Sequence, residues 1–313
     1  MNKVKGCVFL AALVCAFFSC TEVIEIEVPD FPTSPVINCF FTNDTVVKLR
    51  LSKTVNPLDS IPATISDARI WLYEDDVLAG ELSYLDGFFV SDIIPQSGKI
   101  YSVRVEIPEF PDIAEISAKD ILPTNPIMTS CSFRDSALLD QDGFPVSQAI
   151  INIEDNSMGL QYYEVLIEMS YKRTSLDTVY ETINADYCKE NYDPVLTKEG
   201  LVEFRPRTLV FSNESFIGQT YPLKVNFQNE MYLEDTYPQY REMRIIVHLR
   251  KVSESYYKYK RQLVIHQSSI SSDFWSGTTE PSTMYTNING GYGIFAGYTE
   301  VVDTVTKYYN FIW

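Results

Sequence analysis

The segment Arg241-Glu242-Met243-Arg244-Ile245-Ile246-Val247-His248-Leu249-Arg250-Lys251-Val252 shows the folding pattern of this chain most clearly. Apolar residues recur at every second position from Met243 to Leu249. Successive side chains of a β-strand point to opposite faces, so this period predicts a strand with one face against a core. The alternate positions form a mostly polar row: Arg244, Ile246, His248 and Arg250.

The same alternation recurs in the N-terminal half, at residues 47–51, 69–73 and 101–107. Turn signals rich in Asn, Asp, Pro and Gly separate these segments. Short strands with no helical stretch between them predict a small antiparallel sandwich of immunoglobulin-like type over residues 35–122.

Pro123-Thr124-Asn125-Pro126 predicts the end of this domain, because prolines remove hydrogen-bond donors from a β ladder. We expect a second β-rich domain over residues 127–313. Its strands are expected near residues 129–135, 147–154, 161–172, 177–183, 207–212, 222–228 and 241–252. The fold class is therefore mainly β, with two antiparallel sandwich-like domains.

Two segments of the second domain depart from the strand pattern. Ser253 to Gln267 holds no Gly or Pro and has aromatic and apolar residues at helical spacing, so we expect a helix at about residues 253–267 with Ser253 as its N-cap. Asn184 to Arg205 has the composition of a long irregular insertion. Tyr187 and Tyr192 within it are candidate partner contacts, because aromatic residues on long loops often serve recognition. The alternative is that they cover the adjoining core.

The N-terminus predicts a secretory signal that ends in a lipidation site. Lys3 and Lys5 precede an apolar run that is too short to span a bilayer. Phe17-Phe18-Ser19-Cys20 resembles a bacterial lipobox, with Phe17 where Leu is usual. We therefore expect residues 1–19 to be a signal peptide and Cys20 to carry lipid, the alternative being an ordinary signal peptide followed by a coincidental cysteine.

Residues 20–34 are expected to form an acidic tether that prolines stiffen at its end. Acidic residues directly after a lipidated cysteine resemble the signals that send some Bacteroidota lipoproteins to the outer face of the outer membrane. The predicted location is therefore the outer membrane, lipid-anchored, at the cell surface. The alternative is that the tether is only a solvated linker.

The charge of the chain limits its partners. The formal net charge is −17, and loss of Lys3 and Lys5 with the signal would leave 23 basic and 42 acidic residues. Nucleic acids and anionic lipid surfaces would repel such a chain, so membrane contact is expected through the N-terminal lipid and no nucleic acid is expected as a partner.

The sequence does not assemble a catalytic constellation. Only His248 and His266 are present, and none of the common hydrolase or metalloprotease motifs occurs. Asp140-Gln141-Asp142-Gly143 resembles half of a calcium loop but lacks the further oxygen ligands, which favours a plain turn. We therefore expect no enzyme activity, no catalytic residues, no cofactor and no metal site.

Three cysteines remain after Cys20. Cys39 lies in an apolar run and is expected to be a buried thiol. Cys131 and Cys188 can form a disulfide after export, although the sequence does not show that they are close.

Five Asp-Ser/Thr-aliphatic triplets exceed what ordinary residue usage predicts. They resemble the O-glycosylation motif of exported Bacteroidota proteins, and the alternative is a turn that leads into a strand. The candidate acceptors are Thr45, Ser60, Ser136, Thr178 and Thr304.

Three parts of the chain together resemble a known family. They are the start Cys20-Thr21-Glu22-Val23-Ile24-Glu25-Ile26, the segment Tyr256-Tyr257-Lys258-Tyr259, and the block Asn287-Ile288-Asn289-Gly290-Gly291-Tyr292-Gly293-Ile294-Phe295. They are similar to the Bacteroidota lipoproteins catalogued as domain of unknown function 4249. The glycines of the block allow positive φ and a close backbone approach at a turn before a strand.

The resemblance implies a role but no chemistry. The family has no assigned activity, and its members are often encoded beside TonB-dependent outer-membrane receptors. We therefore expect an accessory or binding subunit, with a TonB-dependent receptor as its partner. The alternative is a structural or adhesive surface lipoprotein with no transport role.

Overall fold

The computed structural model describes residues 32–55, 63–173, 180–187, 191–204, 206–228, 240–276 and 283–308. Contacts divide the chain into two compact units. Apart from Pro32, the first unit (Met1–Pro32 with Asn56–Ser60) lies outside the described residues. All described strands and helices belong to the second unit, Thr33–Val55 with Ile61–Trp313. The signal peptide, Cys20 and most of the tether therefore stay predictions.

The described chain is mainly β, as the alternation predicts. The strands before the proline pair are β1 (Pro35–Phe41), β2 (Lys48–Lys53), β3 (Arg69–Glu74), β4 (Val77–Leu85), β5 (Phe88–Val90), β6 (Ile100–Glu106) and β7 (Ile116–Ile121). The strands after it are β8 (Ile127–Leu139), β9 (Pro145–Glu154), β10 (Tyr162–Arg173), β11 (Tyr180–Asn184), β12 (Asp186–Tyr187), β13 (Leu209–Ser212), β14 (Thr220–Gln228), β15 (Tyr240–Val252), β16 (Ile288–Asn289) and β17 (Tyr292–Tyr308). The helical elements are α2 (Pro194–Glu199), the 3₁₀ helix η1 (Val202–Phe204) and α3 (Glu254–Ser276).

The strands form two sheets around two main hydrophobic cores. Strands β1 to β7 enclose one core, whose buried side chains alternate along β1, β2, β3 and β6 as predicted. The second core lies between a four-stranded sheet, ordered β12-β14-β9-β8, and the strands β10, β15 and β17 of the larger sheet. The predicted apolar row of β15 is fully buried in this second core: Met243, Ile245, Val247 and Leu249.

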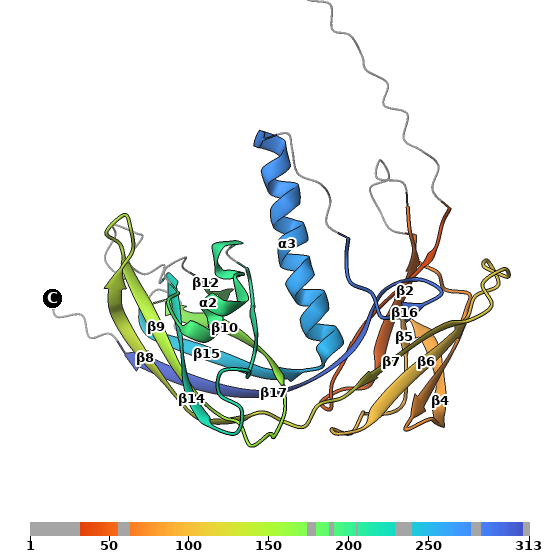
Figure 1. Cartoon of the computed structure of the whole chain (residues 1–313), viewed down its shortest axis with the longest axis horizontal. Helices are drawn as coiled ribbons and strands as arrows, with labels where there is room; N and C mark the ends of the chain where they lie inside the picture. Colours follow the sequence, from red (N-terminus) through yellow and green to blue (C-terminus); the bar gives the residue numbers. More distant parts are fainter. Residues whose placement is uncertain are drawn as a thin grey trace, which may run out of the picture. The chain divides into compact units, whose positions relative to one another are not determined.

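Strand β17 belongs to both strand groups, which the predicted domain boundary does not anticipate. Its first part pairs in parallel with β1, with Val36 opposite Tyr292, and its second part pairs antiparallel with β15 (Figure 1). Phe295 of β17 is buried in the first core. The pairing joins residues far apart in the chain, so local composition cannot reveal it.

The glycine block makes the β1–β17 pairing possible. Gly293 has φ +102°, and a Cβ there would lie 2.0 Å from the carbonyl oxygen of Ile37 on β1. Gly290 has φ +73°, and a Cβ there would lie 2.2 Å from the carbonyl oxygen of Glu115. Both positions therefore require glycine for conformation and for space, as the sequence predicts.

Helix α3 begins where the sequence predicts it. The Ser253 hydroxyl accepts a 3.2 Å hydrogen bond from the backbone N–H of Tyr256, as an N-cap does. The helix continues to Ser276 and is therefore longer than predicted, because no Gly or Pro interrupts the chain before Gly277. Figure 1 shows α3 starting beside β15 and β17 and pointing away from the sheet. Within the described residues, no helix has the length and apolar composition needed to cross a membrane.

The segment from Asn184 to Arg205 is not irregular, and that prediction is wrong. It contains β12, α2 and η1. Asp193 is the N-cap of α2 and accepts a 3.0 Å hydrogen bond from the backbone N–H of Val195, while Gly200 ends the helix at φ 68°. The pattern Asp193-Pro194, followed by Gly six residues after the proline, is a helix start and stop signal for this short helix.

Candidate functional site

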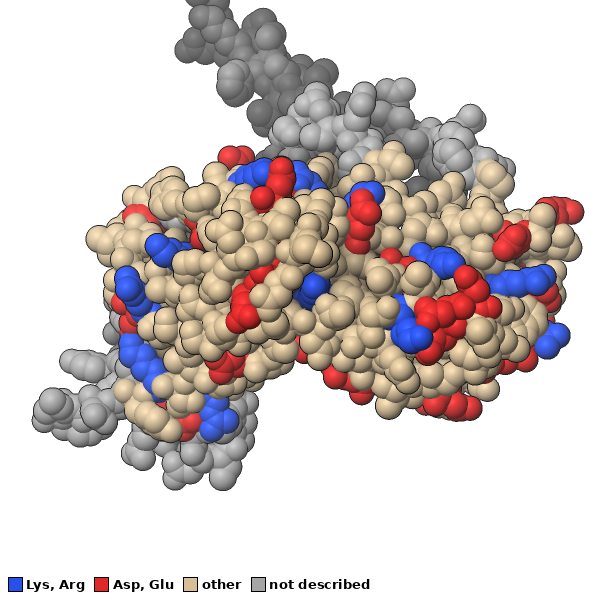
Figure 2. Space-filling model, turned by 60° about the horizontal axis from the view of Figure 1, so that its bottom comes forward, with Lys and Arg blue, Asp and Glu red and all other residues tan. Residues whose placement is uncertain are grey.

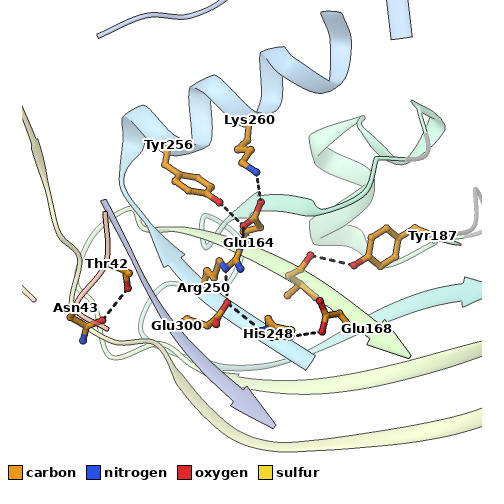
Figure 3. Close-up of polar contacts among 11 residues, drawn as sticks. Thr42, Asn43, Glu164, Glu168, Tyr187, His248, Arg250, Tyr256, Lys260 and Glu300 are labelled. Carbon is orange, nitrogen blue, oxygen red and sulfur yellow. Dashed lines mark hydrogen bonds and ion pairs between the residues drawn. The ribbon is translucent and has the colours of Figure 1, made fainter. Parts of the chain in front are cut away.

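Charged residues line up across β10, β15 and β17 on the face that points away from the second core. Glu164, Arg250 and Glu300 are direct cross-strand neighbours in the register of the three strands. Arg250 Nη1 donates to Glu164 Oε2 over 2.8 Å, and Arg250 Nε donates to Glu300 Oε2 over 2.6 Å. We call these three residues the ionic ladder (Figure 3).

Helix α3 covers the ladder with two side chains of its first turns. The Tyr256 hydroxyl donates to Glu164 Oε2 over 2.7 Å, and Lys260 Nζ lies 3.5 Å from Glu164 Oε1. Figure 3 shows both side chains pointing from the helix toward Glu164. Lys260 Nζ also lies 5.6 Å from the ring centre of Phe40 on β1, within cation–π range. The start of the helix is thus held by charge, hydrogen bonds and aromatic contact together.

The Glu164 side chain has no exposed surface, so its charge depends on these partners. Burial alone raises the pKa of Glu164, but the nearby Lys260 and Arg250 outweigh it and leave that pKa below its usual value. Burial opposes the charge on Arg250, and Glu164, Tyr256 and Glu300 together raise the pKa of the guanidinium. Removing one partner of a buried ion pair costs about 3–5 kcal/mol, because the other charge stays desolvated.

His248 extends the ladder toward a third carboxylate. Its Nδ1 lies 3.3 Å from Glu300 Oε2, and its Nε2 lies 3.4 Å from Glu168 Oε2. A hydrogen bond to Glu300 raises the pKa of His248, and the charge of Glu168 adds to the rise, while burial opposes it. When His248 is protonated, three cations face three carboxylates near the start of α3. The cations are His248, Arg250 and Lys260, and the carboxylates are Glu164, Glu168 and Glu300. The site can therefore hold the helix electrostatically, and its charge changes by one when His248 gains or loses a proton.

The alternation of β15 places His248 and Arg250 on a polar strand face, but it does not identify their partners. Glu164 and Glu300 lie 86 and 50 residues away from Arg250 along the chain. Each sits at a polar position of an alternating strand, which is the only signal that could have pointed to it. His266, the other histidine, lies further along α3 as predicted.

Tyr187 is not a surface residue, and its prediction as a partner contact is wrong. It is 3 % exposed and packs in the second core. Its hydroxyl accepts a 2.9 Å hydrogen bond from the backbone N–H of Ile167 and lies 3.4 Å from the carbonyl oxygen of Val165. The alternative reading, that this tyrosine covers the core, describes it correctly.

Tyr192 is 73 % exposed, and both of its chain neighbours are buried. Asn191 donates from Nδ2 to the carbonyl oxygen of Asn226 over 2.9 Å and accepts from Asn226 N over 2.6 Å. Asp193 accepts from the Tyr221 hydroxyl over 2.8 Å and from Lys224 N over 2.9 Å. The two neighbours therefore fix the backbone to β14 and present the tyrosine ring to solvent.

A groove of about 550 Å³ lies over β6 and β7. The cations that line it are paired with carboxylates: Lys119 with Asp76 at 2.8 Å, and Arg104 with Glu106 at 3.2 Å. Its charges are therefore balanced, and it does not favour an anionic ligand. Figure 2 shows the same mixing elsewhere, with acidic and basic side chains interspersed over the face that it displays.

Three of the candidate glycosylation residues lie in the described part of the chain. Thr45, Ser136 and Thr304 are all exposed, which an acceptor requires. Thr304 lies inside β17 and Ser136 inside β8, so these two triplets are not turns that lead into a strand. Ser60 and Thr178 lie outside the described residues. Glycosylation at these five positions stays a prediction.

The remaining predicted positions are the three cysteines after Cys20 and the segment from Asp140 to Gly143. Cys39 is 1 % exposed, as predicted, and burial raises the pKa of its thiol. Cys131 carries a free thiol, and Cys188 lies outside the described residues. The Asp140 carboxylate accepts from the backbone N–H groups of Asp142 and Phe144 over 3.0 and 2.7 Å, which makes this segment a turn, as predicted. In the described part of the chain, no group of three or more His, Cys, Asp or Glu side chains could hold a metal ion.

Comparison with known proteins identifies the family of this chain. No curated protein matches the chain. A family model described as a domain of unknown function, DUF4249, matches residues 21–304, which is most of the chain. The protein therefore belongs to the DUF4249 family.

Proposed function

We propose that the protein is a lipid-anchored accessory subunit of the outer membrane that faces the cell surface and binds a TonB-dependent receptor. The observation that carries the proposal is the signal that ends in Phe17-Phe18-Ser19-Cys20. An acyl chain on Cys20 would hold the β-rich body beside membrane proteins, and the acidic surface would keep that body away from anionic lipid. The role is one of binding, not of catalysis.

The presentation of Tyr192 supports a binding role. Aromatic residues dominate many protein interfaces because they bury a large area for little loss of conformational entropy. The loop around Tyr192 is already fixed by Asn191 and Asp193, so less order would be lost on binding. Tyr192 is therefore the side chain we assign to the receptor interface.

Membrane attachment is tested by replacing Cys20 with Ser in the full-length chain. The wild-type protein is expected in the outer-membrane fraction and the Cys20→Ser protein in the soluble fraction. The variant Cys39→Ser is the control, since that thiol is buried in the first core. Retention of the Cys20→Ser protein in the membrane would exclude the lipid anchor.

Receptor binding is tested by affinity purification from detergent-solubilised membranes. A TonB-dependent receptor is expected in stoichiometric amount with the wild type and in several-fold lower amount with Tyr192→Ala. Tyr308→Ala is the matched control, because Tyr308 is 70 % exposed at the far end of β17. If no receptor co-purifies with the wild type, the alternative of a structural or adhesive surface protein replaces the proposal.

A further inference from the structure

Lys251 interrupts the apolar row of β15. The row that begins at Met243 continues on the core face to Leu249, and Lys251 occupies its next position. Its cross-strand neighbours in the sheet are Tyr163 and Thr299, which are 2 % and 0 % exposed. A lysine thus stands where the alternation calls for an apolar residue.

The ammonium of Lys251 is weakly compensated. It donates a 3.2 Å hydrogen bond to Thr124 Oγ1 and forms no ion pair with any carboxylate of the described chain. The side chain is half-buried, and loss of water lowers the pKa of the ammonium, while the charge of Asp155 partly opposes this fall. The cations of the ladder and of the groove over β6 and β7 each have a carboxylate within 4.0 Å. Lys251 differs from them in this respect.

Lys251 lines a pocket of about 350 Å³, which is the size of a small-molecule site. The pocket lies between the end of β15, the segment 124–127 and the turn between β9 and β10. Its neutral hydrogen-bonding side chains are Thr124, Asn125, Asn156, Ser157 and Gln161, and two carboxylates, Glu154 and Asp155, also line it.

Both acids of the pocket already accept hydrogen bonds from neighbouring donors, and Glu154 Oε1 accepts from Asn156 Nδ2 over 2.8 Å. The Asp155 carboxylate accepts from Asn213 Nδ2 at 2.7 Å, from Gly218 N at 3.0 Å and from the Ser157 hydroxyl at 3.0 Å. Burial tends to raise the pKa of Asp155, but these donors outweigh burial and lower it. The Asp155 charge still favours the charged form of Lys251, but its carboxylate forms no ion pair with the ammonium, which leaves Lys251 Nζ to meet a ligand.

We propose that this pocket binds a small carboxylate that also carries hydroxyl or amide groups, with the ligand carboxylate on Lys251 Nζ. Asn125 Nδ2 and Gln161 Oε1 can bond the remaining polar groups of such a ligand, since the other amide atoms of these two side chains already bond Asn43 and Leu160. A carboxylate next to the ammonium replaces the water that Lys251 loses on folding. Ligand binding at this site needs only residues of this chain and does not depend on the receptor partnership proposed above.

Calorimetry on the full chain in detergent tests the site with D-glucuronate and D-glucose, two sugars that differ in the carboxylate. Glucuronate is expected to bind and glucose to give no measurable heat. Lys251→Met is expected to weaken glucuronate binding at least about ten-fold, since a charge-assisted contact is lost. Lys224→Met is the matched control, because Lys224 is an exposed lysine on β14. Equal binding of the two sugars, or unchanged affinity in Lys251→Met, would overturn the proposal.

The same variant has a second readout in stability. Lys251→Met places an apolar side chain at a core-facing position and removes a desolvated cation, so the urea midpoint is expected to stay equal or rise. A lower midpoint would overturn the premise that the ammonium is kept there for a ligand. Retention of a receptor by Lys251→Met in affinity purification would separate this site from the receptor interface.

Discussion

The two faces of the sheet formed by β10, β15 and β17 are built from opposite chemistry on the same strands. On one face, the side chains from Met243 to Leu249 are apolar and fully buried against the four-stranded sheet. On the other, Glu164, Arg250 and Glu300 form the ionic ladder beneath α3. Apolar burial stabilises by removing area from water whatever lies opposite, whereas a buried charge stabilises only with its particular partner. The core face should therefore tolerate similar substitutions, and the ladder face should not.

The largest expected effect comes from breaking the ladder. Arg250→Met leaves the buried carboxylate of Glu164 without its closest cation and is expected to lower the free energy of unfolding by about 3–5 kcal/mol. Urea denaturation measures the loss. Arg244→Met is the control on the same strand face, because its ion pair with Glu242 is partly exposed, and it should cost about 1 kcal/mol or less.

A double variant separates the loss of a charge pair from the loss of packing. Arg250→Met combined with Glu164→Leu removes both charges and is expected to recover much of the stability that Arg250→Met alone loses. If the double variant is no more stable than Arg250→Met, the ladder does not act through an uncompensated charge.

Two adjacent isoleucines on β15 allow the core face and the ladder face to be compared with the same residue type. Ile245 is fully buried in the second core, and Ile246 points to the ladder face and is half-buried. Ile245→Ala is expected to cost about 3 kcal/mol and Ile246→Ala about 1 kcal/mol, because the first leaves a cavity in a packed core. Equal losses in urea denaturation would mean that both faces are packed alike.

His248 predicts a pH dependence that belongs to the ladder face. Its pKa is raised in the folded protein, chiefly by Glu300, so its contribution to stability is fully present below pH 6.5. The contribution is lost as the pH rises through the folded pKa. In His248→Gln this fall of stability with rising pH should disappear. Urea midpoints measured at several pH values between about 5.5 and 9 would reveal it. A slope that persists in the variant would assign it to another group.

A smaller effect is expected where α3 meets β7. The Asp120 carboxylate accepts hydrogen bonds from the Ser253 hydroxyl and from Gly297 N, and burial raises its pKa from 3.8 to about 6. The folded state then binds more protons than the unfolded state between these values, so stability falls as the pH rises from 3.8 to about 6. Asp120→Asn keeps an acceptor at this place and should flatten that fall. An unchanged slope would contradict the assignment to Asp120.

Much of the fold could be predicted because its signals are local. The alternation of β15, the N-cap Ser253 and the positive φ of Gly293 each depend on the residue and its near neighbours. The β-rich class and the positions of most strands follow from such signals. The end of α3 was underestimated because the absence of Gly and Pro continues beyond the residues with clear helical spacing.

The site was less predictable, since its members come from separate strands. Tyr187 and Tyr192 have the same residue type and lie five residues apart, yet one is buried at 3 % exposure and the other is exposed at 73 %. Their difference depends on Ile167, whose backbone binds Tyr187, and on β14, which fixes the loop of Tyr192. No local pattern separates the two.

The sequence by itself determined that the chain is mainly β, where α3 begins, which residues of β15 face a core, and which glycines allow positive φ before a strand. Only the tertiary structure decided that β17 pairs with β1, that Arg250 meets Glu164 and Glu300, and that Lys251 lines a pocket. The physical reason is the range of the interactions. Backbone conformation and side-chain direction are set within a few residues, whereas ion pairs, pockets and parallel strand pairs join residues that meet only after folding.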